Sequence, residues 1–342
     1  MKKLLAPLFS ILLYSSCQRP PQKPAEAEHT IAFYNIENLF DTEDDPKTND
    51  ADFLPEGDLK WTQERYQKKL TDIAKVIGGI GDEDGPEILG LCEIENRKVV
   101  QDLVNTAPLS NRNYAISHFD SKDRRGIDVA LIYKTNIFKP LREKNYTVTF
   151  DDPELLTRDI LLVTGLFNGR DTLSVLVNHW PSRRGGDESA KNRMTVALRA
   201  KEISDSLLNK SAYHYVLLMG DFNDEPTDKS ITEGLQASNL LPSGNNSRHL
   251  YNAHFDLKHQ GKGTYNYRGQ WNMLDQIIIS PAFFSSAGIS YVPNSAAIYS
   301  PDWLQDTGKY AGNPLRMYAG KSYIGGYSDH FPVYIRVKTE VR

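Results

Sequence analysis

The chain has 342 residues, of which 39% are hydrophobic and 25% charged, and its formal net charge is −4. This composition suits a folded soluble protein and excludes a global attraction to polyanions, so any binding of phosphate must come from local basic clusters. Beyond Cys17 only Cys92 remains, so we expect no intrachain disulfide, and stability must come from the core.

The N-terminal segment has the order of parts that is typical of an export signal. Two lysines precede a mostly apolar run at residues 4–13, and two serines and Cys17 follow. The run is too short to span a bilayer as a mature helix. A cysteine directly after two serines resembles the lipobox of bacterial lipoproteins, although Tyr14 stands where leucine is usual. A plain signal peptide with an incidental cysteine is the alternative.

These features predict an exported, membrane-anchored lipoprotein in the periplasm or at the cell surface. We expect a signal peptide over residues 1–17, a lipid on Cys17 as the only membrane contact, and a polar, Pro-rich tether over residues 18–29. One globular domain should follow over residues 30–342, because no linker rich in Pro, Gly or Ser divides the chain after residue 30. We expect a monomer.

Apolar runs and their periodicity predict the elements of this domain in chain order. We expect strands over residues 29–38, 86–93, 126–133, 216–219, 273–279 and 331–337, a hairpin of residues 160–167 and 173–177, and helices over residues 61–77 and from residue 188 onward. Residues 301–327 are rich in Gly and aromatic residues with little periodicity, which predicts a long binding loop. Segment 41–58 is acidic and broken by Pro46, Pro55 and Gly57, which predicts a surface loop. Its charge density would also suit a calcium loop, but it lacks the ordered ligand spacing of an EF-hand.

Polar side chains that can bind a metal or move a proton lie where these strands end. They are Asn35, Glu37, Glu93, His179, Asp221, Asn223, Asp329 and His330. Any one of them is explained by a surface position, and Asp221 with Asn223 could form an ordinary Asx turn, but so many in one structural context would be an odd coincidence for a scaffold. Asp221 and Asn223 are two residues apart, so both side chains point to the same side if the backbone stays extended.

The residue types at these positions indicate phosphoryl chemistry. Carboxylates and amides without clustered cysteines favour a hard ion such as Mg²⁺ or Mn²⁺ over zinc. Two histidines, with Asp275 available to orient one of them, supply a proton-transfer group. Arginines in the loops at residues 124–125, 183–184 and 316 can grip phosphate oxygens with their planar guanidinium groups.

Short motifs containing these residues occur in a fixed order along residues 30–338. They are Asn35 with Glu37, Glu93 in Leu-Cys-Glu, His179 in Asn-His-Trp-Pro, Gly220-Asp221-Phe222-Asn223, Asp275 in Leu-Asp-Gln-Ile, and Ser328-Asp329-His330-Phe331-Pro332. Together they resemble the motifs of the endonuclease/exonuclease/phosphatase superfamily. The fourth and sixth motifs are highly specific as a pair, whereas Asn-x-Glu alone is weak. The extended Trp-Pro-Ser-Arg-Arg-Gly-Gly turn and the Gly/Tyr-rich approach to Ser328 depart from the best-known members, which leaves the substrate open.

The resemblance implies an α/β fold of four layers, an α/β/β/α sandwich. Two packed, mostly antiparallel sheets would have helices outside, and loops at one edge would form the site. A doubly wound α/β sheet is the alternative from patterning alone, but that fold needs a helix between most strands, and residues 160–177 offer none.

The resemblance also implies which residues hold the metal. Glu93, helped by Glu37 or Asn35, would hold Mg²⁺ (or Mn²⁺) against a phosphate oxygen. Further candidate ligands are Asp221, Asn223 and Asp329.

Proton transfer and substrate binding are assigned in the same way. His330, oriented by Asp275, would act as general base or protonated clamp, with Asp221 as the competing base. Asn223 would support the attacking water, and His179 would donate to the phosphate or the leaving group. The candidate substrate-binding residues are Arg125, Asp128, Arg183, Arg184, Arg316 and Tyr327.

We therefore expect a metal-dependent phosphoester hydrolase that acts outside the cytoplasm, with a nucleic-acid phosphodiester as the first choice of substrate. The arginine-bearing loops and the aromatic residues at positions 303, 310, 318, 323 and 327, which could stack bases, support this choice. Exposed arginines are usually just solvated and loop tyrosines often pack on their own domain, so a phosphomonoester, a phospholipid or an inositol phosphate is the alternative. A surface lipoprotein that binds a glycan or phospholipid without catalysis is the alternative from another class.

Overall fold

The computed structural model describes residues 26–211, 214–242, 248–285 and 287–340, whose main strands form two mixed sheets. The first sheet contains β1 (Glu26–Leu39), β2 (Ile88–Ile94), β3 (Tyr114–His118), β4 (Asp128–Lys134), β14 (Ser290–Tyr291), β15 (Ala297–Ile298) and β18 (Val333–Glu340). The second contains β5 (Phe138–Tyr146), β6 (Ile160–Phe167), β7 (Asp171–His179), β8 (Tyr215–Asp221), β9 (Ala237–Ser238), β10 (Leu250–Asn252) and β13 (Asp275–Ile279). Neighbouring strands are antiparallel except in the pairs β1–β2, β7–β8 and β9–β10.

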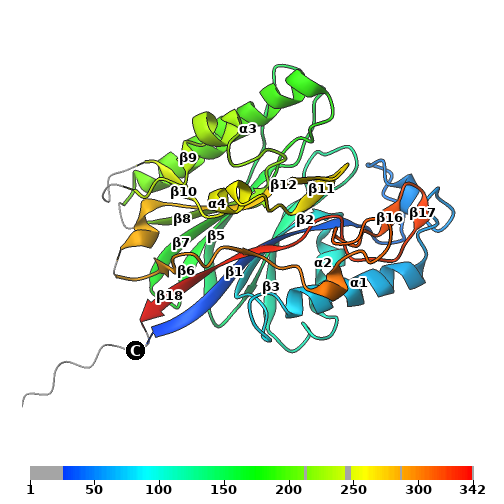
Figure 1. Cartoon of the computed structure of the whole chain (residues 1–342), viewed down its shortest axis with the longest axis horizontal. Coiled ribbons are helices and arrows are strands. Elements are labelled where there is room, and N and C mark those ends of the chain that lie inside the picture. Colours follow the sequence, from blue (N-terminus) through cyan, green and yellow to red (C-terminus); the bar gives the residue numbers. More distant parts are fainter. Residues whose placement is uncertain (1–25, 212–213, 243–247, 286, 341–342) are drawn as a thin grey trace, which may run out of the picture.

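Helices lie outside the two sheets (Figure 1). α1 (Gln63–Gly78) and α2 (Arg97–Val104) pack on the first sheet, and α3 (Gly186–Leu208) packs on the second. α4 (Phe255–His259) is a short helix between β10 and the hairpin of β11 (Tyr265–Tyr267) and β12 (Gln270–Asn272). The remaining elements are η1 (Ala51–Phe53), η2 (Ser230–Gly234), η3 (Pro281–Phe284), η4 (Asp302–Leu304), β16 (Tyr318–Ala319) and β17 (Ser322–Tyr323).

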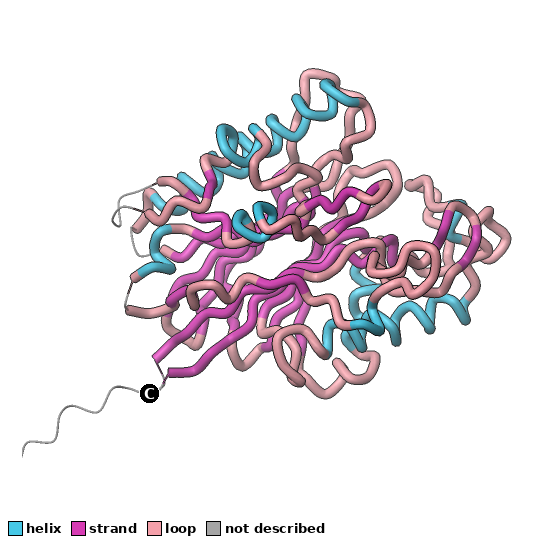
Figure 2. Tube along the Cα trace, in the orientation of Figure 1, coloured by secondary structure: helices cyan, strands magenta, loops and turns pink. Residues whose placement is uncertain are grey.

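The alternation of side chains along the strands explains the layers, which Figure 2 shows as strands between helices. In β8, Leu217 packs in the core between the two sheets, whereas Leu218 packs in the core beneath α3. Because both faces of this strand are buried, its sequence is a continuous apolar run. Gly90 of β2 lies where the two sheets pack closely, since a Cβ at this position would collide with the Met219 side chain. The predicted four-layer sandwich is confirmed.

The element boundaries agree with the sequence-based expectations in most places. The predicted hairpin is present, with Asn168 and Gly169 in its turn at φ +49° and +69°. Two differences concern loops and ends. β1 begins at Glu26, so residues 26–28, expected in the tether, pair with β18. The expected long loop at residues 301–327 contains η4 and the β16–β17 hairpin, because its aromatic residues pack against α1.

The predicted signal peptide, Cys17 and the tether up to residue 25 lie outside the described residues. Within the described residues, no helix is both long and apolar enough to cross a bilayer. Cys92 is buried with a free thiol.

Candidate active site

The strand registers bring the predicted residues to one edge of the sandwich. Asp221, the last residue of β8, is the register partner of His179 at the end of β7 and of Asp275 at the start of β13. In the other sheet, Asn35 of β1 pairs with the residue before Glu93 in β2. Residues far apart in the sequence therefore end in one cluster.

Asp221 lies at the centre of this cluster. Its Oδ2 accepts a hydrogen bond from Asn35 Nδ2 at 3.1 Å and lies 3.7 Å from His179 Nε2 and 3.9 Å from His330 Nε2. Glu93 Oε1 lies 3.4 Å from Asn35 Nδ2 and 3.9 Å from His179 Nε2. One carboxylate oxygen thus faces an amide and two imidazoles in a buried environment.

A chain of contacts fixes the ring of His330. Its Nδ1 lies 2.7 Å from Asp275 Oδ2, and Thr264 Oγ1 donates to the same oxygen at 2.5 Å. The ring of Tyr265 stacks on the imidazole with 4.9 Å between centroids. Ligand atoms of Asp221, Asp275 and His330 lie within 4.8 Å of one another, a spacing that could hold a metal, but the short contact between Asp275 and His330 favours proton sharing.

Several residues of the cluster have left-handed backbone conformations. The φ angles are +49° at Glu37, +55° at Asn38 and +61° at Glu93. Such conformations are strained for non-glycine residues and concentrate at functional sites. Here the turns allow Asn38 N to donate to Glu93 Oε2 at 3.1 Å, which fixes one oxygen of the predicted metal ligand.

The backbone at Asn223 differs from the extended conformation considered from the sequence. An extended chain would place the side chains of Asp221 and Asn223 on the same side, but φ at Asn223 is +50°. Asn223 Nδ2 donates to Trp180 O at 3.0 Å, and its backbone N donates to Asp221 Oδ1 at 2.9 Å. Asn223 therefore closes a turn that holds Asp221, and the two side chains do not run parallel.

Burial and the charges of neighbouring acids raise the pKa values of the carboxyl groups of the site. Burial, reinforced by the charge of Asp329, raises the pKa of Glu93 and raises that of Glu37 to about 8. Burial also raises the pKa of Asp221 to about 6, against the opposing charge of His330. A hard divalent cation would relieve this repulsion, so the donor set fits Mg²⁺ or Mn²⁺. The oxygen donors are Glu93, Glu37, Asn35, Asp221 and Asp329.

The two histidines have opposite charge states. Burial, together with the charges of Arg158 and Arg125, lowers the pKa of His179 well below its usual value. Burial acts in the same direction on His330, but the charge and hydrogen bond of Asp275 outweigh it and raise the pKa of His330 well above its usual value. The surroundings of His179 therefore favour the neutral ring, and those of His330 favour the imidazolium.

Two of the predicted substrate-binding arginines border the cluster. Arg125 lies close enough to Glu93 and His179 for its charge to act on both. It opposes the rise in the pKa of Glu93 and adds to the fall in the pKa of His179. Arg316 Nη2 lies 4.0 Å from Asp329 Oδ2, and its guanidinium also interacts with the Tyr265 hydroxyl. Both side chains are partly exposed, so both can meet a ligand.

Arg183 has a different position from the one expected. Its Nε donates to Asn223 O at 2.8 Å, Nη1 to Asn272 Oδ1 at 3.0 Å and Nη2 to Asp228 Oδ2 at 3.2 Å. Two of its nitrogens therefore brace the loop after β8, and the third holds the end of β12. The neighbouring Arg184 is exposed and forms no hydrogen bond or ion pair with any described residue.

Asp128 is also occupied by internal contacts. Its Oδ2 lies 3.1 Å from His118 Nε2, and its Oδ1 accepts a hydrogen bond from Ser121 N at 2.8 Å. The residue is buried, so it shapes the loop that carries Arg125 and presents no free oxygen to a substrate.

Most of the aromatic residues that were expected to stack bases pack on their own domain. Tyr318 is only 7% exposed, Arg65 lies over the Tyr323 ring at 4.2 Å, and Tyr327 contacts Trp303 with 5.3 Å between ring centroids. Tyr310 is 55% exposed and Trp303 is 37% exposed. These residues therefore form no continuous stacking surface within the described part of the chain.

The sequence of the chain also matches a known protein family. The model described as the Endonuclease/Exonuclease/phosphatase family matches residues 30–339. The chain belongs to this family. It is a phosphoester hydrolase with candidate metal-binding groups at its site. No curated protein sequence matches the chain significantly.

Solved structures with low sequence identity share the fold. Humanized D. rerio TDP2 has 14% identity and a TM-score of 0.57, covering 91% of this chain and 98% of that one. A family protein from Bacteroides thetaiotaomicron has 16% identity and a TM-score of 0.56, covering 93% and 100%. A mannosyl-6-phosphatase from the same organism has 16% identity and a TM-score of 0.52, covering 90% and 99%. At such identities the likeness supports the fold alone.

Lys69 is a buried cation beside the acids of the cluster that was not predicted from the sequence. This residue of α1 is 1% exposed, and its Nζ donates to Tyr327 O at 2.5 Å. Burial lowers the pKa of Lys69 to about 8, against the charges of Glu37 and Asp329, so the ammonium stands beside the site acids. A lysine at a position of the apolar stripe of the predicted helix is the signal that could have identified it.

Arg158 is a second buried cation that the sequence does not indicate. Its Nε donates to His179 O at 3.2 Å, Nη2 to Trp180 O at 2.6 Å and Nη1 to Asp123 Oδ2 at 3.0 Å. It ties the end of β7 to the loop that carries Arg125. Nothing in the local sequence distinguishes it from a solvated arginine.

Lys69→Met is expected to destabilise the metal-free protein by roughly 3 kcal/mol, because it leaves buried carboxylates without their internal cation. Mg²⁺ should restore more stability to this variant than to the wild type, since a bound cation replaces the lost charge. Thermal unfolding with and without Mg²⁺ measures both effects. Lys68→Met is the matched control, because Lys68 is half exposed on α1 and its ammonium meets only Asp72 and Gly325 O among the described residues, away from the acids of the site. Equal melting temperatures for the two variants would contradict this role of Lys69.

Glu37 and Asp221 are expected to make the metal-free protein less stable as the pH rises from about 5 to about 8. The pKa of Glu37 is raised from 4.5 to about 8 and that of Asp221 from 3.8 to about 6, so at these two groups the folded state binds more protons than the unfolded chain. The lowered pKa values of His179, His29, His214, His249 and His254 act in the opposite direction. The difference in melting temperature between the wild type and Glu37→Gln in chelator isolates the contribution of Glu37: it should move in favour of the variant as the pH rises, and a difference independent of pH contradicts this role.

Proposed function

We propose that this protein hydrolyses a phosphoester with the help of Mg²⁺ or Mn²⁺ at the cluster around Asp221. One observation carries the proposal: Asn35, His179 and His330 all lie within 3.9 Å of a single oxygen, Asp221 Oδ2. Buried acids and histidines with strongly shifted pKa values are typical of catalytic sites and costly for a scaffold.

Glu93, Glu37, Asn35 and Asp329 are the residues that would hold the metal. When bound, the ion supplies Lewis-acid stabilisation of the charge that develops on the phosphate oxygens. Glu93 is the first candidate ligand, because one of its oxygens is fixed by Asn38 N while the other faces Asn35 and His179.

The side chains of the cluster would move the proton and steady the phosphate. Asp221 is the base that takes the proton of the attacking water, because His330 is already protonated. The imidazolium of His330 would stabilise the negative charge of the phosphate, and the neutral ring of His179 would donate one hydrogen bond to a phosphate oxygen or the leaving group. Asp275 acts through His330 by holding its ring.

A small phosphoester suits this site better than a nucleic-acid strand. Arg125 and Arg316 border the cluster, each beside one acid (Asp123 and Asp329), and would meet a phosphate there, whereas Arg183 is bound to the protein and Arg124 to Glu154. A strand requires a row of cations and stacking surfaces. The tyrosines near Arg316 are mostly packed, and the net charge of −4 adds no attraction. One similar structure is a mannosyl-6-phosphatase, which agrees with a small substrate.

Cleavage of a nucleic-acid phosphodiester is the second candidate. Arg184 is exposed beside the braced Arg183, at the turn that follows β7. A similar structure, D. rerio TDP2 with 14% identity and a TM-score of 0.55, is complexed with a single-strand DNA product.

A parallel assay with Mg²⁺ on sugar phosphates, inositol phosphates, sphingomyelin, RNA, and single- and double-stranded DNA separates these candidates. Turnover of a small ester, little changed between about 50 and 200 mM salt, is the expected result. Cleavage of DNA or RNA that falls steeply over the same salt range would establish the second candidate, and no turnover of any ester would contradict both.

We also propose that the protein is exported and held at a membrane by a lipid on Cys17. The support is the order of basic, apolar and small residues before this cysteine. Cys17→Ser should move the protein from the membrane fraction to the soluble fraction, because the lipid is the only predicted anchor. Fractionation of both forms in the native host, followed by immunoblotting, measures this. Identical fractionation of the two forms would show the anchor to be wrong.

A further inference from the structure

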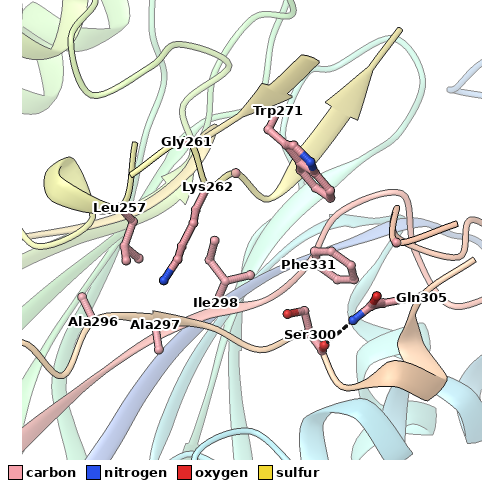
Figure 3. Close-up of a pocket in the computed structure, with 12 residues that line it drawn as sticks. Leu257, Gly261, Lys262, Trp271, Ala296, Ala297, Ile298, Ser300, Gln305 and Phe331 are labelled. Atoms are coloured by element: carbon pink, nitrogen blue, oxygen red, sulfur yellow. Dashed lines mark hydrogen bonds between the residues drawn. The ribbon is translucent and has the colours of Figure 1, made fainter. Parts of the chain in front are cut away.

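A pocket of about 410 Å³ lies beside the catalytic edge, between α4, the β11–β12 hairpin and segment 296–312 (Figure 3). Its walls are largely apolar, with Leu257, Trp271, Ile298 and Phe331 as the large side chains and alanines between them. This volume lies within the usual range of small-molecule pockets, which is about 300 to 1,000 Å³.

The pocket carries one unpaired positive charge. Lys262 extends its side chain toward Leu257 and Ile298 (Figure 3), and its Nζ forms no ion pair or hydrogen bond with any residue that the structure describes. None of the residues that line the pocket is acidic, although the chain as a whole has a net charge of −4. Apolar walls with a single free ammonium are complementary to an apolar molecule that bears one negative charge.

The pocket borders the catalytic cluster but shares no side chain with it. Phe331 directly follows His330, and its ring stacks on Trp271 with 6.0 Å between centroids and 19° between planes. Tyr265, in the same hairpin as Trp271, stacks on His330. Different side chains of one hairpin thus contact the pocket and the catalytic histidine.

We propose that this pocket binds a small amphiphilic anion, namely an acyl chain or ring that bears one carboxylate or phosphate. The apolar part would lie against Trp271, Phe331 and Ile298, and the charged group would meet Lys262. The proposal is independent of the hydrolytic function, because none of these residues belongs to the cluster around Asp221.

Isothermal titration with octanoate tests this proposal, with acetate and 1-octanol as probes of the charged group and the chain alone. Octanoate should bind more tightly than either part, because only octanoate uses both features of the pocket. Octanoate that binds no more tightly than acetate and 1-octanol would overturn the proposal.

Two variants locate the binding site. Ala297→Phe fills the pocket and should weaken octanoate binding by about tenfold or more, which corresponds to about 1.4 kcal/mol. Lys262→Met removes the charge from an exposed position, so the fold should persist, and it should weaken octanoate but leave 1-octanol unchanged. Lys139→Met, at an exposed lysine of β5, is the matched control and should change nothing. Octanoate binding that survives both pocket variants unchanged would place the ligand elsewhere and overturn the proposal.

Discussion

His330→Ala is expected to lower kcat by about a hundredfold or more while leaving the fold intact. The variant removes the imidazolium 3.9 Å from Asp221 Oδ2, so the phosphate loses a fixed positive charge and Asp221 loses its charged neighbour. Asp275 keeps its hydrogen bond from Thr264, which limits the structural damage. Steady-state kinetics at saturating metal, beside a thermal melt of each variant, measure the two effects.

His259→Ala is the matched control for this variant, because His259 is exposed on α4, where its ring contacts that of Phe255. Its kcat should equal that of the wild type. His330→Gln, which can still donate to Asp275, separates charge from position: it should keep the melting temperature yet remain strongly impaired. A kcat within a few-fold of the wild type for His330→Ala would exclude His330 from the chemistry.

Removal of divalent metal with EDTA is expected to abolish hydrolysis, and added Mg²⁺ or Mn²⁺ should restore it. The reason is the group of buried acids around Glu93 and Glu37: burial and the charge of Asp329 raise the pKa of both, and a bound cation would offset the cost of ionising them. Without a cation, these acids would repel the phosphate of a substrate. Rates before chelation, after chelation and after dialysis against each metal measure the effect.

Far-UV circular dichroism in EDTA is the control for this experiment and should be unchanged, since the core consists of apolar side chains and does not depend on the ion. Glu93→Gln should raise the Mg²⁺ concentration that half-restores activity, because it weakens the first candidate ligand. Full activity in chelator would show that the metal assignment is wrong.

The sequence predicted the parts of the fold that follow from burial patterns. The continuous apolar run before Asp221 made β8 recognisable, because a strand buried on both faces leaves no room for polar residues. The hairpin at residues 160–177 excluded a doubly wound sheet, since it joins two strands without a helix. The motif order then indicated the family.

The backbone and the partners of individual side chains could not be predicted in the same way. The left-handed turn at Asn223 depends on Asp221 and Trp180, which are fixed only by tertiary structure. The same holds for Arg183. Its place in a loop suggested a guanidinium group free to bind phosphate, but in the folded chain its nitrogens donate to Asn223, Asn272 and Asp228.

The aromatic residues near Arg316 show a similar limit. A Tyr-rich loop has the same composition whether its rings stack bases or pack on a helix. Here α1 supplies Arg65 over the ring of Tyr323 and Lys75 over the rings of Trp303 and Tyr327, so these rings pack mostly on the domain. That packing is what moves the proposed substrate from a nucleic-acid strand toward a small phosphoester.

Hydrolysis in water enriched in ¹⁸O tests most directly the claim that water attacks phosphorus at the cluster around Asp221. The preferred ester would be turned over once by excess enzyme with Mg²⁺, and both products analysed by mass spectrometry. Attack of water on phosphorus should place one ¹⁸O atom in the phosphate product and none in the released alcohol. Asp221→Asn should form no labelled product within the same time. Label in the alcohol, or labelled phosphate formed equally fast by Asp221→Asn, would contradict it.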